Sequence, residues 1–393
     1  LDDSAAKGMP GVRQIVNTSS GVAVVADSWW QARKARDALR IGWDGSATAA
    51  LNDGSILRGL KQASGGAGLL APAQVNVHTT FLGGGFGRRL EVDVISAAVE
   101  ASKAVGKPVK LLWTREDDTT HDAYRPPAWD TAVAGFDDDG KLVAWKLHLT
   151  GPSITARVFP GAIAAGSVDP FCVEAAANFP YDVPNVLVDW VPHEVGFNVG
   201  YWRSVSHALN CFVAESFMDE LAYSAGKDPA EFRRTLLAKQ PRYLEVLEVA
   251  LRRAGYDKPA EGRFRGVAVM EGYDTYMAQV AEISITDGKV KVHRIVCAVD
   301  CGRAVIPAII SAQVESSIIF GLSAALWGEI NVQGGRVQQT NFHDYRVLRI
   351  AEVPIIETHL VDSDEPPGGI GEPATALVAP AVCNAIYAAT KQR

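Results

Sequence analysis

Two glycine-rich segments constrain this chain of 393 residues more than any other feature of its sequence. The first reads Gly-Gly-Gly-Phe-Gly-Arg-Arg over residues 83–89, and the second reads Gly-Gly-Ile-Gly-Glu-Pro over residues 368–373. The first is not a dinucleotide-binding fingerprint, because Arg88 stands where the third glycine would fall. It is not a P-loop either. Because glycine lets a ligand approach the backbone, the two segments indicate a bulky cofactor gripped from two parts of the chain, with Glu372 directed into the site.

The composition is that of a globular protein that does not bind nucleic acid. Hydrophobic residues make up 48% of the chain and charged residues 21%, and the length allows two or more domains. The net charge of −7 argues against nucleic acid or an anionic membrane as a partner. No apolar run is expected to span a bilayer, because the longest, residues 308–327, is interrupted by Gln313 and Glu315. The five cysteines include no C-x-x-C pair, so we expect buried structural cysteines rather than a metal or iron–sulfur site.

The order of the expected helices and strands predicts an α+β fold. In the first half we expect a hairpin at 12–25, a helix at 28–39 capped by Ser28, and a strand at 75–81. A helix at 92–105, a strand at 109–113 and a second hairpin at 131–150 are expected to follow. In the second half we expect a helix at 210–225, a second helix that begins at 228, and a set of alternating strands at 267–299. A buried helix at 308–327 and a last helix that begins near 380 are expected to follow. Residues 64–72 are expected to form a linker. The absence of a regular βαβ rhythm favours α+β over a doubly wound sheet.

Glu372 is the candidate catalytic residue. The proline that follows it disfavours the helical region, so we expect Glu372 to be extended. Pro380 is expected at the first position of the last helix, where it would anchor the segment. The alternative is a solvated turn that carries an incidental acid, but the long glycine-rich pattern around Glu372 favours a general base.

The first glycine segment is expected to lie between a strand and a helix. This order places loop N–H groups and a helix N-terminus on one side of a site, which suits anions and oxo groups, with Phe86 packed over the site. The alternative is a glycine-rich turn that is needed only for packing. Taken alone, the segment does not decide between the two interpretations.

Two further polar residues, Arg203 and Gln313, have both a binding and a structural interpretation. Arg203 could hold a phosphate or the edge of a pterin through paired hydrogen bonds, or it could form a structural ion pair with Glu215 or Asp219. Gln313 could bond a cofactor amide or phosphate, or it could be a polar residue of a helix surface.

These residues belong to a series of motifs that runs from about residue 75 to the end of the chain. The motifs are Phe-Leu-Gly-Gly-Gly-Phe-Gly-Arg-Arg (81–89), Trp-Thr-Arg-Glu-Asp-Asp (113–118), Tyr-Trp-Arg-Ser-Val (201–205), Glu-Ser-Phe-Met-Asp-Glu-Leu-Ala (215–222), Cys-Ala-Val-Asp-Cys-Gly (297–302), Asn-Phe-His-Asp-Tyr (341–345) and Pro-Pro-Gly-Gly-Ile-Gly-Glu-Pro (366–373). In this order they resemble the molybdenum hydroxylases of the xanthine dehydrogenase family. The resemblance is to the molybdopterin-binding large subunit of isoquinoline 1-oxidoreductase-type enzymes, often called membrane-bound aldehyde dehydrogenases.

The resemblance implies a role for each candidate residue. Glu372 would be the catalytic base, the first glycine segment would contact the oxo ligand and dithiolene of the cofactor, and Arg203 and Gln313 would hold the pterin or its nucleotide tail. No protein side chain would bind the metal directly. The implied cofactor contacts are those of Gly84, Gly85, Phe86, Gly87, Arg88, Arg203, Thr275, Tyr276, Gln313, Gly369 and Gly371.

The resemblance also implies a reaction and partners. Glu372 would deprotonate a molybdenum-bound hydroxide, whose oxygen attacks an aldehyde or N-heteroaromatic carbon while hydride passes to a sulfido ligand. Two electrons would leave through [2Fe–2S] clusters of a separate small subunit, and a cytochrome c is a further candidate partner. The implied cofactor is molybdopterin in its molybdenum cytosine dinucleotide form, and the implied location is periplasmic or membrane-associated.

The resemblance divides the chain into three parts and leaves one alternative function open. Residues 1–63 would be a remnant of an α/β hammerhead domain, and residues 73–238 and 239–393 would be two parts of the molybdopterin-binding domain. Relative to the family, the chain lacks several dozen residues before residue 75, which favours the alternative of a metal-free, inactive scaffold of the same fold. A nicotinamide dehydrogenase is disfavoured, because the Rossmann fingerprint is absent.

Overall fold

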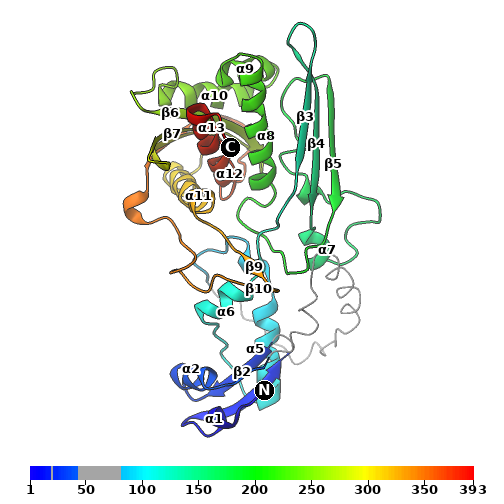
Figure 1. The fold of residues 1–393 in the computed structure, drawn as a ribbon, viewed down its shortest axis with the longest axis vertical. Coiled ribbons are helices and arrows are strands. Elements are labelled where there is room, and N and C mark those ends of the chain that lie inside the picture. Colours follow the sequence, from blue (N-terminus) through cyan, green and yellow to red (C-terminus); the bar gives the residue numbers. More distant parts are fainter. Residues whose placement is uncertain (19–20, 43–80) are drawn as a thin grey trace. The chain divides into compact units, whose positions relative to one another are not determined.

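The computed structural model describes residues 1–18, 21–42 and 81–393, which group into two compact units (Figure 1). The first unit consists of residues 1–124, 196–201 and 330–344, and the second unit consists of residues 125–195, 202–329 and 345–393. Each unit is therefore assembled from segments that are separate in the sequence. The expected linker at 64–72 and all but the last residue of the strand expected at 75–81 lie outside the described residues.

The first unit opens with a hairpin and two helices. Strand β1 (Val12–Thr18) pairs antiparallel with β2 (Gly21–Ala26), helix α1 (Ser4–Lys7) lies against β1, and α2 (Trp29–Asp37) packs on β2. The hydroxyl of Ser28 accepts a hydrogen bond from the backbone N–H of Gln31 at 3.4 Å and so caps α2. The predicted hairpin and the predicted cap are both confirmed.

The other described residues of the first unit form helices, a short hairpin and irregular segments. Helix α5 (Asp93–Val105) ends at Gly106, which adopts the left-handed conformation, and α6 (Arg115–Thr120) begins at a capping box formed by Thr114 and Asp117. Strands β9 (Val332–Gln333) and β10 (Arg336–Val337) form a short hairpin. The strand predicted at 109–113 is wrong, because these residues pair with no described strand and a strand needs a neighbour to complete its hydrogen bonds.

The second unit is built on a four-stranded sheet with the order β11-β8-β7-β6. Its strands are β6 (Phe264–Gly272), β7 (Thr275–Thr286), β8 (Lys289–Asp300) and β11 (Ile355–Leu360). Neighbours β6, β7 and β8 are antiparallel, as the alternating pattern predicted, whereas β11 joins β8 in parallel. The tight turn between β7 and β8 falls at the predicted residues 286–288.

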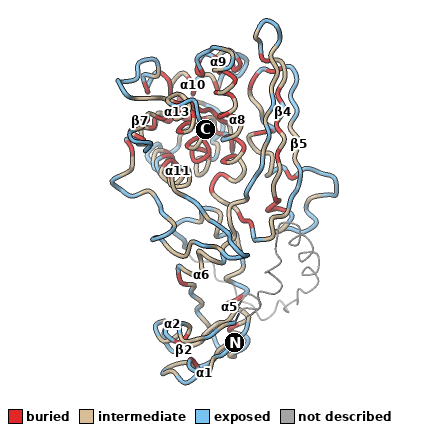
Figure 2. The backbone as a smooth tube through the Cα atoms, viewed as in Figure 1, coloured by how far each residue is buried: buried red, intermediate tan, exposed pale blue. Residues whose placement is uncertain are grey.

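Both faces of this sheet are covered by helices. Val267 and Val269 of β6 pack with α10 (Pro241–Ala254) in one apolar core, whereas Ala268 and Met270 pack with α11 (Pro307–Leu326) and α13 (Val378–Thr390) in another. This alternation follows from the period of two residues along a strand. Figure 2 shows that the buried residues gather in these layers.

A second sheet in this unit has the order β3-β4-β5. The predicted hairpin is confirmed as β3 (Thr131–Phe136) and β4 (Leu142–Gly151), and β5 (Asn185–Pro192) adds to β4 in parallel. The two predicted consecutive helices are α8 (His207–Ser224) and α9 (Pro229–Leu236), and the side chain of Asp228 caps α9. Short helical segments complete the unit: α7 (Ile154–Val158), η3 (Pro170–Cys172), η4 (Ile350–Glu352) and α12 (Pro373–Ala376).

A buried ion cluster joins α8 to α9. The guanidinium of Arg233 bonds Glu215 at 3.0 Å and Asp219 at 2.5 Å, and the hydroxyl of Tyr181 also donates to Glu215. Arg233 satisfies both carboxylates that sequence analysis considered for Arg203. The structural interpretation of Arg203 as their ion-pair partner is therefore wrong.

Two helical stretches of the described residues, Pro307–Leu326 and Pro373–Thr390, are long and apolar enough to cross a membrane by length and composition alone. The expectation that no apolar run reaches this length was therefore too strict. Both stretches contribute buried residues to the core beside the sheet, which is how apolar core helices of globular proteins also behave.

Candidate active site around Glu372

Residues 368–372 form a loop that is bonded to two other parts of the second unit through its glycines. The N–H of Gly368 donates to the carbonyl oxygen of Cys301 at 2.9 Å, just after β8. The N–H of Gly369 donates to the carbonyl oxygen of Tyr273 at 2.7 Å, and the hydroxyl of Thr275 donates to the carbonyl oxygen of Gly369 at 2.8 Å. The loop is thereby fixed to the tip of the β6–β7 hairpin.

Glycine is required at two positions of this loop by the closeness of the hairpin. A Cβ atom on Gly368 would lie 2.5 Å from the carbonyl oxygen of Asp274, and one on Gly369 would lie 2.9 Å from Cβ of Tyr273. Gly371 differs, since a Cβ atom there would meet nothing within 4 Å. At residues 368 and 369, glycine thus permits the close approach of the hairpin rather than of a ligand. At residue 371, the space beside the backbone is open.

Glu372 is the N-cap residue of α12, and its side chain is partly exposed. Its carbonyl oxygen accepts a hydrogen bond from the N–H of Thr375 at 3.0 Å, which starts the helical turn. Because of this bond ψ is −43°, so the predicted extended conformation of Glu372 is wrong. The first helical position belongs to Pro373, whereas Pro380 occupies the third position of α13, so the place predicted for Pro380 is also wrong.

Arg203 is only 4% exposed and links the loop to α11. Its Nε donates to the carbonyl oxygen of Gly371 at 2.7 Å, and its Nη atoms donate to Ser316 Oγ at 2.9 Å and Gln313 Oε1 at 3.0 Å. Burial lowers the pKa of the guanidinium, and the charge of Glu372 opposes this shift. Arg203 and Gln313, both predicted cofactor contacts, are thus brought together, and they form a hydrogen bond with each other. Their predicted contact with a cofactor stays a prediction.

Residues 273–276, a stretch that the family resemblance places near the cofactor, include the tip of the β6–β7 hairpin. Tyr273 and Asp274 form a two-residue turn with φ of 60° and 61°, a conformation in which glycine and asparagine are common and tyrosine is rare. The Tyr273 ring stacks on that of His207, with centroids 4.8 Å apart and planes 34° apart. The turn and its contacts with the Glu372 loop and His207 were not predicted.

Four buried polar atoms beside this turn have no hydrogen-bond partner among the described residues: Tyr273 Oη, Ser204 Oγ, His207 Nδ1 and Glu174 Oε2. His207 Nδ1 and Glu174 Oε2 are 3.2 Å apart, but their orientation is not that of a hydrogen bond. Burial raises the pKa of the Tyr273 phenol far above its usual value, and the carboxylates of Glu372 and Glu174 raise it further. Glu372 therefore has a tyrosine hydroxyl within electrostatic reach.

The two predicted residues of β7 point to opposite faces of the sheet. Thr275 is fully buried and bonds the loop through Gly369. The ring of Tyr276 lies 4.9 Å from that of Tyr243 and 4.1 Å from the guanidinium carbon of Arg242, on the side of α10. Thr275 thus supports the Glu372 loop. For Tyr276, the predicted proximity to a cofactor stays a prediction.

The first glycine segment lies in the first unit. Gly84 and Gly87 have φ of 129° and 101°, and Phe86, also at positive φ, is 47% exposed. Arg88 forms ion pairs with Asp93, at 2.9 Å, and with Asp122. The helix predicted at 92–105 is confirmed as α5, and it follows the segment after a 3₁₀ turn, η2 (Arg88–Leu90). The predicted cofactor contacts of Gly84, Gly85, Phe86, Gly87 and Arg88 stay predictions.

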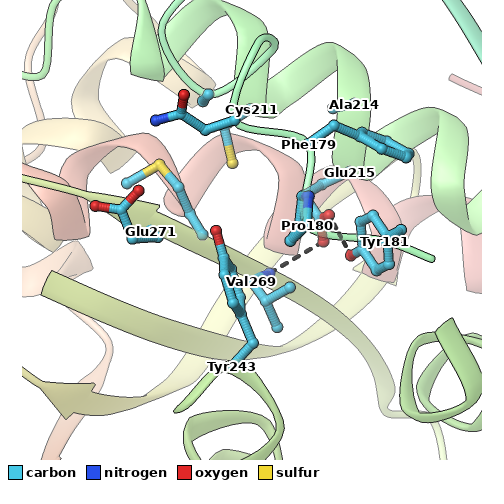
Figure 3. A pocket seen from close by; sticks show the side chains of 12 residues that line it. Phe179, Pro180, Tyr181, Cys211, Ala214, Glu215, Tyr243, Val269 and Glu271 are labelled. Carbon is cyan, nitrogen blue, oxygen red and sulfur yellow. Dashed lines mark hydrogen bonds between the residues drawn. The ribbon is translucent and has the colours of Figure 1, made fainter. Parts of the chain in front are cut away.

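A small cavity of the second unit lies at the end of β6, apart from the Glu372 loop (Figure 3). Its lining includes Tyr181 and Glu215, whose hydrogen bond is drawn, together with Tyr243 and Glu271. Ala175, the neighbour of Glu174, also lines it. The cavity therefore borders the buried ion cluster on one side and the segment of Glu174 on another.

Comparison with known protein families identifies the chain. Residues 65–237 match the family described as molybdopterin cofactor-binding domain, and residues 215–354 match a second family of the same description. This chain belongs to the molybdopterin-binding proteins of the xanthine dehydrogenase family. The predicted family is thereby confirmed.

Several curated relatives have similar sequences. The chain is 32% identical to the isoquinoline 1-oxidoreductase subunit beta of Brevundimonas diminuta, over 82% of this chain and 42% of the relative. It is also 32% identical to the membrane-bound aldehyde dehydrogenase (pyrroloquinoline-quinone) of Gluconacetobacter polyoxogenes, over 82% of this chain and 45% of the relative. The chain thus spans less than half the length of these relatives.

Solved structures confirm the predicted fold class. The aldehyde oxidoreductase of Desulfovibrio gigas superposes with a TM-score of 0.71 at 14% identity, over 100% of this chain and 73% of that one. The quinoline 2-oxidoreductase of Pseudomonas putida 86 gives a TM-score of 0.67 at 14% identity, over 79% of this chain and 65% of that one. At such identity the likeness establishes the α+β fold alone.

Proposed function

We propose that this chain is the molybdopterin-binding part of a molybdenum hydroxylase that oxidises an aldehyde or N-heteroaromatic carbon, with Glu372 as its base. The observation that carries the proposal is that the Glu372 loop is bonded to the end of β8, to the β6–β7 hairpin and, through Arg203, to α11. The chain in which this loop occurs belongs to a family of molybdopterin-binding proteins. A carboxylate held this firmly and still partly exposed is suited to proton transfer at a defined point.

The residues around Glu372 fit a bound molybdopterin. Gly371 has open space where a side chain would project, immediately beside the carboxylate. Behind it lie buried hydroxyls of Tyr273 and Ser204 that have no partner among the described residues, and buried polar groups of this kind normally accompany a polar ligand or ordered water. Gly369 and Gly371 are the backbone groups of the loop that would face the cofactor.

When bound, the molybdopterin group would supply the two-electron redox centre and activate a water-derived oxygen. Glu372 would accept the proton of that oxygen and later release it. The guanidinium of Arg203 lies within electrostatic reach of Glu372, and its bond to Gly371 holds the backbone next to the base. The chain itself therefore contributes proton transfer and positioning.

The finer features of the proposal rest on the family resemblance. We propose that the cofactor is the cytosine dinucleotide form, that Gly84 to Arg88, Arg203, Gln313 and Tyr276 contact it, and that electrons leave through a small [2Fe–2S] subunit and a cytochrome c. We also propose a periplasmic or membrane-associated location. The division at about residue 238 into two molybdopterin-binding parts belongs to the same proposal.

Metal analysis of the purified protein tests this function first. Near-stoichiometric molybdenum, with CMP released by acid hydrolysis, is expected from a host that makes the cofactor. Glu372→Gln should keep the molybdenum and lose turnover of isoquinoline and benzaldehyde with a dye as electron acceptor, whereas Glu365→Gln, a change at an exposed glutamate earlier in the same segment, should keep both. A protein without molybdenum would instead be the inactive scaffold.

A further inference from the structure

The side chains behind Glu372 take no part in the proton transfer proposed above. We define the Tyr273 cluster as Tyr273, Ser204, His207 and Glu174, which all belong to the second unit. The hydroxyls of Tyr273 and Ser204 are buried and form no hydrogen bond of good geometry in the described part of the chain, and His207 Nδ1 lies 3.2 Å from Glu174 Oε2 without the orientation of a hydrogen bond. Buried polar atoms without a well-oriented partner are rare in protein interiors, so this cluster calls for a physical reason.

The cluster is held in place by unusual backbone. Tyr273 and Ser204 have φ of 60° and 81°, which costs free energy for residues other than glycine. His207 lies against the Tyr273 ring, and a Cβ atom on Gly272 would come within 2.8 Å of the imidazole, so only glycine permits this stacking. The fold thus accepts strain in order to keep the phenol and the imidazole together beside the loop.

The cluster joins the Glu372 loop to a side chain with access to water. The N–H of Gly369 in that loop donates to the carbonyl oxygen of Tyr273 at 2.7 Å, and the Tyr273 ring stacks on that of His207. His207 Nδ1 lies 3.2 Å from Glu174 Oε2, and the side chain of Glu174 is 18% exposed while that of His207 is 6% exposed. The charges of Glu372 and Glu174 both act on the Tyr273 phenol.

We propose that the Tyr273 cluster carries protons from Glu372 to solvent, an inference that rests on the function proposed above. In one transfer, protonated Glu372 gives its proton to Tyr273 Oη while the proton of the phenol passes to the Glu174 carboxylate. Glu372 is then ionised, Tyr273 is again a neutral phenol, and Glu174 releases the proton to water. Ser204 and ordered water between the orphaned atoms complete the hydrogen bonds, and no electron is transferred.

The charges that face the phenol suit this direction. Glu372 and Glu174 flank it, His207 stacks on it, and Arg203 lies beside Glu372. The high pKa of the phenol means that Tyr273 remains protonated between transfers, so it can always donate.

Tyr273→Phe tests the proposal, with Tyr223→Phe, near the C-terminal end of α8 and against the ring of Tyr387, as the matched control. In the holoenzyme, Tyr273→Phe should lower kcat for isoquinoline roughly 100-fold, the size of a lost proton-transfer group, at unchanged molybdenum content and KM. The solvent deuterium isotope effect on kcat should rise. Tyr223→Phe should change none of these quantities.

A second readout does not depend on turnover. Infrared difference spectra of the protein can follow the carboxylate of Glu372 through a pH titration, with Glu372→Gln to assign the band. Loss of the nearby hydroxyl in Tyr273→Phe should shift the carboxylate band of Glu372, and Glu174→Gln should give the same kinetic defect with the phenol present.

The outcomes separate this inference from the proposed function. Turnover that requires Glu372 but has the same kcat and isotope effect in Tyr273→Phe and Glu174→Gln would overturn the proton path alone. If Tyr273→Phe does not fold, Glu174→Gln decides the matter by the same two measurements. A wild-type protein without molybdenum and turnover would overturn both proposals.

Discussion

In the segment at 368–371 glycine permits close approach of another backbone, whereas in the segment at 84–87 it permits positive φ. Gly368 and Gly369 have ordinary backbone angles but lie against Asp274 and Tyr273. Gly84 and Gly87 have φ of 129° and 101°. Two segments of similar composition thus need glycine for different physical reasons, and only one of them forms a tightly bonded loop in its own unit.

The largest effect in this comparison is expected for Gly368→Ala. The new methyl group would lie 2.5 Å from a backbone oxygen that cannot move independently, so the loop must leave the hairpin. We expect the free energy of unfolding to fall by about 3 kcal/mol, in the range of overpacked cores. Urea denaturation followed by tryptophan fluorescence measures this, and an unchanged midpoint would contradict the close approach.

Arg203→Leu should have the next largest effect. It leaves the carbonyl oxygen of Gly371 and the amide of Gln313 without their buried donor, which costs roughly 2 kcal/mol of unfolding free energy. Arg203→Lys is the charge-preserving comparison, and it should recover only part of the loss because an ammonium cannot make the same set of bonds. Equal stability of all three proteins in urea would show that the loop does not depend on Arg203.

Gly87→Ala should have a smaller effect, which we expect to come from backbone strain. A residue with a Cβ atom at φ of 101° is disfavoured, which we expect to cost about 1 kcal/mol. Gly87→Asn is a useful control, since asparagine tolerates positive φ better than alanine. If thermal unfolding shows no difference between wild type and both variants, the segment does not need positive φ.

Gly371→Ala should have the smallest effect on stability, below about 0.5 kcal/mol, because its methyl group enters open space. The same methyl group would occupy the space proposed for the cofactor, so the molybdenum content should fall. Metal analysis beside urea denaturation separates the two effects. A stable variant with full molybdenum would place the cofactor elsewhere.

Local signals predicted the elements of the fold well. The Ser28 cap, the Asp228 cap with Pro229, and the turns at 137–140 and 286–288 were all readable because their chemistry acts within a few residues. The segment 109–113 failed for the complementary reason: its residue types suit a strand, but a strand also needs a partner that local sequence cannot supply.

The surroundings of Glu372 were less predictable than Glu372 itself. The glycine pattern singled out the carboxylate, but its partners come from elsewhere: Arg203 reaches Gly371 across 168 positions, and Thr275 reaches Gly369 across 94. The turn conformation of Tyr273 was not predictable for another reason, since tyrosine seldom occupies a turn with positive φ. Such contacts depend on topology, which single residues do not encode.

The long reach of these contacts also bears on how the molecule matures. A bond across 168 positions forms only after the sheet and α11 have come together, because closing so large a chain loop is entropically costly until other contacts support it. Glu372 is therefore among the last groups to reach its final position during folding. In a newly made or partly unfolded molecule, the proposed base therefore lacks the bond from Arg203 that holds the backbone beside it.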